Sequence, residues 1–340
     1  MNKVRALVLT ALKILGAFAL ARHIYRKRLR ILCYHGMSVG DQHEFAPILF
    51  MRAETFARRM RLLVSQGWRL VDLETAVREL RDGKVRDKTV VVTIDDGWLS
   101  TLTEAVPILE EYSVPATVYI TTYYSERSAD VFNVAVYYML WKTRVEKVDI
   151  RAGYGGFDGE YDLSKDRVAV GNQWVEFAET HLSWEQRQEL LPVISNALHL
   201  EPESTFQSGR FRIVDREQVR QLHERGIDVQ LHTHRHRLPD VSFEALRDEV
   251  TQNKVLLDTW TGKSCMHFCY PSGVYNHRQS EWLERIGILS STTCDPGMND
   301  TGAHPQRLRR ILDRESWSDL EFDAAMSGVR RLFSRRQQKK

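Results

Sequence analysis

Two spacings of hydrophobic residues alternate along most of the chain. The continuous apolar run of residues 90–94 predicts a buried strand. In residues 53–65, by contrast, Phe56, Met60 and Leu63 recur at helical spacing on one face. These two patterns take turns from residue 30 onward, so the chain alternates predicted strands with predicted helices.

The predicted elements follow a βαβα order. Further strands are predicted over residues 30–34, 116–121, 227–231 and 266–270, and further helices over residues 73–80, 101–112, 216–225, 243–259 and 280–285. This order places the protein in the α/β class, with a parallel sheet or barrel covered by helices. Active sites of such folds lie at the carboxyl ends of the strands.

A segment without this order interrupts the pattern at residues 123–210. It contains an aromatic stretch, residues 131–141, and a helical pattern over residues 184–198. We expect it to be an insertion over or beside the mouth of a distorted (β/α) barrel spanning residues 30–320. A basic tail is predicted for residues 321–340.

The first 29 residues are predicted to form a helix associated with a membrane or with the domain. Residues 6–21 are mostly apolar, but they number only 16 and include Lys13, which is short for a membrane span. The larger cluster of basic residues follows this run, unlike the order of a cleavable signal. An amphipathic helix on the inner membrane surface and a helix packed on the domain are both open, and an uncleaved anchor is the third alternative.

Amino-acid composition and net charge restrict the classes of function that the chain can have. The chain has 340 residues, 43% hydrophobic, and 48 basic residues against 45 acidic ones give a net charge of only +3. This balance disfavours a nucleic-acid partner held by bulk charge. Four scattered cysteines without a CxxC pair are typical of buried thiols in a reducing compartment. We therefore expect a cytoplasmic protein or one attached to the cytoplasmic membrane face, and a secreted form is less favoured.

Two short segments carry candidate metal chemistry. Asp95 and Asp96 end the predicted strand at residues 90–94, and His232 and His236 follow the strand at residues 227–231. Adjacent carboxylates at the end of a buried strand are costly to keep charged without a cation or a catalytic role. Neutral imidazoles are preferred ligands of zinc-like ions. Together the segments predict metal-assisted hydrolysis.

These segments resemble the motifs of a known family. TIDDGW (residues 93–98), LHTHRH (residues 231–236) and CYPSG (residues 269–273) resemble, in this order, the first three motifs of the polysaccharide deacetylases, the NodB-homology or family-four carbohydrate esterases. The third is in a tyrosine-proline-x-glycine form. The resemblance covers about residues 30–313 and implies a NodB-type barrel.

The resemblance implies roles for the carboxylates and imidazoles. Asp96, His232 and His236 would hold a divalent metal, with Zn²⁺ preferred over other first-row ions, and Asp95 would be the general base. His234 alternates with the two proposed ligands, and a three-histidine site is a minor alternative.

The chain departs from the common family pattern at two positions. Cys269 stands where many members carry an arginine that orients the catalytic aspartate, and Arg310 is the candidate replacement, although residues 308–312 also fit a basic, solvated strand edge. The late Leu-x-His motif of the general acid is absent. His304 is the only late histidine, whereas His35 resembles the tyrosine-histidine signature of biofilm poly-N-acetylglucosamine deacetylases. His35 is the candidate acid, against a core histidine that caps a strand.

The implied reaction is removal of an N-acetyl group from an amino sugar. A backbone N–H at or near Tyr270 would stabilise the oxyanion, Pro271 and Gly273 would shape the pocket floor, and Trp98 would stack on a sugar ring or simply pack. The partner would be an N-acetylated sugar or polysaccharide precursor of exopolysaccharide or lipopolysaccharide assembly. The alternatives are a deformylase or other N-acyl amidase on a lipid-linked amino sugar, and a degenerate sugar-binding protein. The sequence leaves the oligomeric state open.

Overall fold

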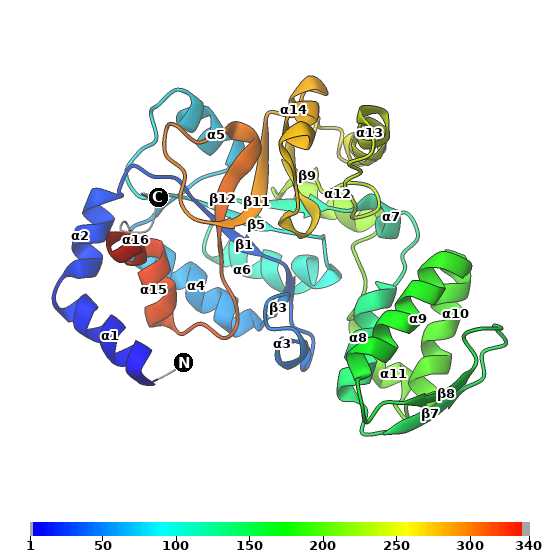
Figure 1. The fold of residues 1–340 in the computed structure, drawn as a ribbon. Helices are drawn as coiled ribbons and strands as arrows, with labels where there is room; N and C mark the ends of the chain where they lie inside the picture. Colours follow the sequence, from blue (N-terminus) through cyan, green and yellow to red (C-terminus); the bar gives the residue numbers. More distant parts are fainter. Residues whose placement is uncertain (1–2, 335–340) are drawn as a thin grey trace.

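A closed barrel of seven parallel strands forms the centre of the computed structural model, which describes residues 3–334 (Figure 1). The strands run around the barrel in the order β1 (Arg30–Tyr34), β12 (Leu308–Leu312), β11 (Ser290–Pro296), β10 (His267–Cys269), β9 (Asp228–Leu231), β6 (Ala116–Ile120) and β5 (Thr89–Ile94). Pairing of β1 with β5 closes it, with Leu32 opposite Val92. The predicted α/β barrel is confirmed.

The sequence pattern explains most of these elements. Every residue of β1 and β5 is buried, which accounts for their mostly apolar sequences. The short strand β4 (Arg69–Leu70) extends the sheet beside β5. The helices that follow the barrel strands or cover them are α4 (Ala53–Ser65), α5 (Leu73–Arg81), α6 (Val106–Glu111, preceded by a π-helical turn, Thr101–Ala105), α12 (Arg216–Glu224), α13 (Phe243–Thr261) and α14 (His277–Arg285).

Strand β11 has no hydrophobic signature in the sequence. It begins Ser-Ser-Thr-Thr, yet these residues are fully buried. Three of the four hydroxyl groups have partners inside the barrel. Ser290 Oγ lies 2.8 Å from His267 Nδ1, Ser291 Oγ donates to Gln306 Oε1 at 2.5 Å, and Thr293 Oγ1 donates to the Leu308 carbonyl at 3.3 Å, whereas Thr292 Oγ1 is buried without a partner in the described part of the chain. Hydrogen bonds to other parts of the chain, rather than apolar burial, therefore allow this polar strand to lie in the core.

The insertion forms a separate layer beside the barrel, coloured green in Figure 1. It contains α7 (Thr122–Ser125), α8 (Phe132–Lys142), β7 (Lys147–Ile150), β8 (Gly159–Asp162), α9 (Arg167–His181), α10 (Trp184–Ala197) and α11 (Pro202–Thr205). Strands β7 and β8 pair antiparallel. Buried residues such as Trp174 and Ile194 give the insertion its own apolar core.

A smaller sheet and helix lie after β1. Strands β2 (Gly36–Met37) and β3 (Phe50–Met51) pair with each other, and α3 (Gln42–Phe45) lies between them in the sequence. The insertion contacts this region, because Tyr138 Oη donates to Asp41 Oδ1 at 2.6 Å.

The two ends of the chain pack together as a helical bundle. Helices α1 (Lys3–Ile14) and α2 (Ala17–Ile24) lie against α15 (Asp319–Ser327) and α16 (Val329–Ser334) (Figure 1). The segment expected to be a basic tail from residue 321 is thus helical up to residue 334, and residues 335–340 lie outside the described part. Within residues 3–334 no single helix has the length and hydropathy of a membrane span, although α1 and α2 meet that test as a pair bent by 70°.

Candidate active site and metal centre

Asp95 and Asp96 follow β5 directly and their carboxylates point to different partners. Asp96 has a left-handed backbone with φ of 73°, which turns the chain sharply between the two residues. The Asp95 carboxylate meets side chains of the barrel interior, whereas the Asp96 carboxylate meets the histidines after β9. The two carboxylates are therefore adjacent in sequence but have separate environments.

Asp95 forms a buried, two-pronged ion pair with Arg310. Arg310 Nη1 donates to Asp95 Oδ1 and Nη2 donates to Oδ2, both at 2.7 Å. Burial alone would raise the pKa of Asp95, but Arg310 outweighs it and, with smaller contributions from His35 and His232, lowers that pKa to about 2. Arg310 thus supplies the cation beside Asp95 that Cys269, at the position of the family's usual arginine, cannot supply.

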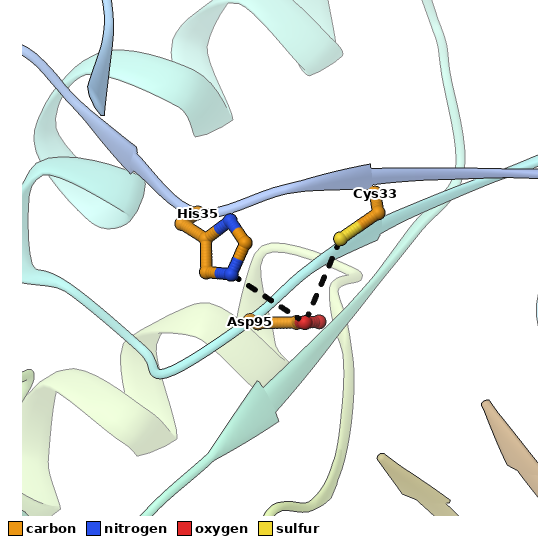
Figure 2. Close-up of side chains that lie close together, drawn as sticks. All are labelled: Cys33, His35 and Asp95. Atoms are coloured by element: carbon orange, nitrogen blue, oxygen red, sulfur yellow. Dashed lines mark hydrogen bonds and ion pairs between the residues drawn. The ribbon is translucent and has the colours of Figure 1, made fainter. Parts of the chain in front are cut away.

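Three further side chains surround the Asp95 carboxylate. Figure 2 shows Cys33, on β1, and His35, just after it, both directed at Asp95. His35 Nε2 lies 3.8 Å from Asp95 Oδ2, and the Cys33 and Cys269 thiols donate to the same oxygen at 3.6 and 3.4 Å. Burial raises the pKa of both thiols, so they remain neutral and add no negative charge. No sequence pattern predicts Cys33 at this position.

Asp96, His232 and His236 converge on one point. Their ligand atoms lie within 4.8 Å of one another, and Asp96 Oδ1 is 3.2 Å from His232 Nε2 and 3.3 Å from His236 Nε2. Burial opposes ionisation of Asp96, but hydrogen bonds with the two rings hold its pKa well below the usual range. One carboxylate and two imidazoles form a donor set that fits a first-row divalent cation.

The tautomer of His232 supports this fit. His232 Nδ1 lies 2.8 Å from the Cys269 carbonyl, and a carbonyl only accepts, so Nδ1 carries the proton. In the neutral ring, Nε2 then has no proton and turns a lone pair toward the Asp96 carboxylate. Two acceptors this close repel each other unless a proton or a cation lies between them. Burial favours the neutral ring, yet Asp96 and Asp95 raise the pKa of His232. The site thus favours a proton or a cation between the two groups.

Asn253 holds the loop that presents the histidines, a role that was not predicted from the sequence. Its Oδ1 accepts from the His232 backbone N–H at 3.0 Å, and its Nδ2 donates to the Ile120 carbonyl and Thr122 Oγ1 at 3.0 and 3.1 Å. A polar residue in helical register with Leu246, Val250 and Leu257 on a buried face was the available signal.

His234 is not part of the metal centre. Its Nδ1 is 2.9 Å from Thr122 Oγ1, and burial lowers the pKa of its ring to about 4. The left-handed backbone of Thr233, with φ of 62°, breaks the extended geometry that would have aligned all three imidazoles. The three-histidine alternative therefore does not match the structure.

A cavity of about 300 Å³ opens beside Asp96 and His236. Trp98 lines it and donates from Nε1 to Asp96 Oδ2 at 2.9 Å. The insertion supplies part of the opposite wall, with Tyr124, Asn133, Val134 and Glu179. The insertion thus lies at the active-site mouth.

The third motif does not line this cavity as expected. Tyr270 and Pro271 are buried, and Tyr270 Oη donates to the Gln306 carbonyl at 3.0 Å. The Tyr270 backbone N–H donates to the Thr292 carbonyl, so it is not available for an oxyanion. A Cβ on Gly273 would lie 2.4 Å from Cys294 Cβ, so this glycine permits close packing. From this turn the cavity is lined only by Ser272.

The fold and this site together define a (β/α)-barrel enzyme with a candidate metal centre. The sequence model of the polysaccharide deacetylase family matches residues 82–139 and 189–290. YxkH of Bacillus subtilis, whose name places it among the polysaccharide deacetylases, is 20% identical over 305 residues, which are 89% of this chain and 77% of that protein. The chain belongs to the polysaccharide deacetylase family, and the prediction of a hydrolase of this family is confirmed.

Solved structures share the fold. The Streptococcus pyogenes deacetylase PplD, in complex with acetate, is 17% identical with a TM-score of 0.59, covering 88% of this chain and 99% of that one. IcaB from Ammonifex degensii is also 17% identical, with a TM-score of 0.54, covering 89% and 96%. Asp95, Asp96, His232 and His236 lie inside the matched segments, whereas His35 and Arg310 lie outside them.

Proposed function

We propose that the protein is a metal-dependent hydrolase that removes the N-acetyl group from an amino sugar of a polysaccharide or its precursor. The convergence of Asp96, His232 and His236, next to an Asp95 carboxylate held by Arg310, carries this proposal. A divalent cation, Zn²⁺ in our proposal, would polarise the acyl carbonyl and acidify water when bound. A protein that only bound sugar would have no need for this arrangement.

The residues of the chain have separate tasks in this reaction. Asp95 remains ionised over the whole physiological pH range, and it accepts a proton from the attacking water. Arg310 fixes both oxygens of Asp95, so the base has a single orientation. His35, on the other side of the same carboxylate, gives a proton to the leaving amine. The cavity beside Asp96, with Trp98 in its wall, receives the sugar.

The proposed function is tested by product analysis with a panel of N-acylated amino sugars in polymeric, nucleotide-linked and lipid-linked forms. We expect acetate and a free amine from N-acetylated members, and loss of turnover after chelation that added Zn²⁺ restores. Release of formate from N-formyl members alone would replace the deacetylase by the deformylase alternative. Sugar binding without any acid release would assign the chain to the binding proteins.

Replacement of His35 by alanine is expected to lower kcat by about 10²–10⁴-fold, because a positioned general acid contributes that much. Bound metal should not change, since His35 is outside the three-residue cluster around Asp96. The loss should shrink for an N-acetyl arylamine, whose leaving group needs less protonation. His223→Ala, on the outer helix α12, is the matched control. Loss of metal from His35→Ala would instead make His35 a ligand.

A further inference from the structure

The N-terminal helices present apolar side chains to solvent. Leu7, Ile14 and Leu15 are 71%, 80% and 80% exposed, and Leu20 and Ile24 are about half exposed. The other face of these helices is buried against α15 and α16. Residues 3–24 contain no aspartate or glutamate. We call Leu7, Ile14, Leu15, Leu20 and Ile24 the apolar ridge. Several exposed apolar side chains on a basic helix pair are typical of an interaction site.

A cavity of about 400 Å³ lies in the neighbouring part of the same bundle, between the ends of β11 and β12 and the helices α15 and α16. Its walls are mainly apolar, with Met298, Ile311 and Ala325, and Arg314 and Arg330 also line it. A Cβ on Gly328 would lie 2.8 Å from Met298 and 2.9 Å from Tyr25, so the cavity wall and the end of α2 are in contact.

Arg310, Arg314, Arg330 and Arg331 line this cavity, and two of them, Arg314 and Arg330, share one aromatic neighbour. Arg314 and Arg330 both stack on the ring of Trp317, with 5.5 Å from each guanidinium carbon to the ring centre. Neither forms an ion pair within 4.0 Å among residues 3–334, and Arg314 Nε is buried without a hydrogen-bond partner.

Like charges lie close enough to Arg330 to affect its ionisation. Burial, and then the charges of Arg5 and Arg314, lower the pKa of Arg330, although Glu321 opposes them. A guanidinium stays protonated despite such a shift, so the repulsion persists in the folded protein. An anion between these side chains would relieve it. Arg5 belongs to α1 and forms an ion pair with Glu321 at 3.2 Å, so the charges that act on Arg330 reach the helix that carries the apolar ridge.

We propose that this end of the molecule binds an anionic phospholipid bilayer, with the apolar ridge among the acyl chains and a lipid phosphate at Arg314 and Arg330. Free phosphate would use the charges, but it would leave the ridge and the apolar cavity walls unexplained. A bilayer satisfies both, since it offers phosphate groups beside hydrocarbon. Membrane attachment would also bring the deacetylase close to membrane-bound glycan precursors.

The proposal is tested by co-sedimentation of the full chain with vesicles of phosphatidylglycerol and phosphatidylcholine, and with vesicles of phosphatidylcholine alone. We expect binding to the anionic vesicles and weak binding to the neutral ones. Arg314→Gln with Arg330→Gln should weaken anionic binding by about 25-fold, since each well-placed cation contributes about fivefold. The matched control, Arg220→Gln with Arg247→Gln, removes the same charge from α12 and α13 and should change binding little.

Two further variants test the apolar ridge and the cavity separately. Leu7→Ser with Leu15→Ser should weaken binding to both kinds of vesicle. Ala325→Leu fills the cavity without changing charge and should weaken anionic binding even if the arginine variants fold poorly. Failure of the wild-type chain to bind either vesicle, equal losses in the arginine variant and its control, or full displacement by soluble glycerol phosphate would each overturn the proposal. Hydrolysis of a soluble N-acetylated sugar should be unchanged in the variants of Arg314 and Arg330 and of Leu7 and Leu15, so this test is independent of the proposed activity. Arg310 lines the same cavity as Ala325, so Ala325→Leu is judged by vesicle binding alone.

Discussion

Replacement of Asp96 by alanine is expected to remove both the bound cation and the hydrolytic activity. Asp96 supplies the only carboxylate of the described three-residue cluster, and its Oδ1 faces both imidazoles at 3.2 and 3.3 Å. Loss of metal catalysis removes several kcal/mol of transition-state stabilisation, so the rate should fall by about 10³-fold or more. Elemental analysis of the purified variant and acetate release together measure the effect.

The neighbouring carboxylate provides the matched control. Asp95→Asn should retain the cation and still lose about 10²–10⁴-fold in kcat, because it removes the base and leaves the cluster around Asp96 intact. The pair of variants thus separates metal binding from proton transfer at adjacent positions. Normal turnover in Asp95→Asn would remove the assignment of the base, and normal metal content in Asp96→Ala would remove the metal centre.

Replacement of Arg310 by methionine is expected to lower the free energy of unfolding by about 3–5 kcal/mol, because it leaves Asp95 charged and buried without its partner. It should also change the pH dependence of kcat. Without Arg310, burial raises the pKa of Asp95, so the base is protonated at low pH and activity increases as pH rises through the new value. Urea unfolding and a kcat–pH profile measure the two effects.

The double variant Arg310→Met with Asp95→Asn tests the cause. It removes both charges, so it should recover much of the lost stability while remaining inactive. A merely structural arginine would destabilise the fold without moving the pH profile. An unchanged profile in Arg310→Met would therefore contradict its role in positioning the base.

The fold could be predicted where burial produces a hydrophobic pattern. Strands β1 and β5 are buried along their whole length, and their apolar residues identify them in the sequence. Strand β11 escaped prediction because its buried side chains are hydroxyls that bond to Gln306 and to the Leu308 carbonyl. These hydrogen-bond partners lie elsewhere in the chain, so no local sequence pattern predicts them. The helices α15 and α16 escaped because the basic residues from Arg330 onward suggested a solvated tail, although α15 itself carries acidic residues and no basic one.

Part of the candidate site could be predicted because its residues follow predicted strands directly. Residues next to strand ends, such as Asp96 and His232, lie close together because parallel strands end on one rim. Contacts made across the barrel were harder to predict, and the proposed place of Arg310 depended on the family resemblance. Cys269 and Asn253 act through specific hydrogen bonds to residues distant in the sequence, which periodicity does not report. The oxyanion role expected for the Tyr270 backbone N–H does not fit the structure, because this N–H already pairs with the neighbouring strand through the Thr292 carbonyl.

The insertion has its own apolar core, yet it contributes Tyr124 and Glu179 to the cavity next to the candidate metal centre. Mutations within that core and on that wall can alter which glycan fits without disturbing Asp95 or its arginine. In the proposed reaction, part of glycan recognition would thus be encoded in the insertion and bond cleavage in the barrel. Selection can diversify the first while conserving the second, and exchange of the inserted unit between relatives is a direct route to new substrate preferences.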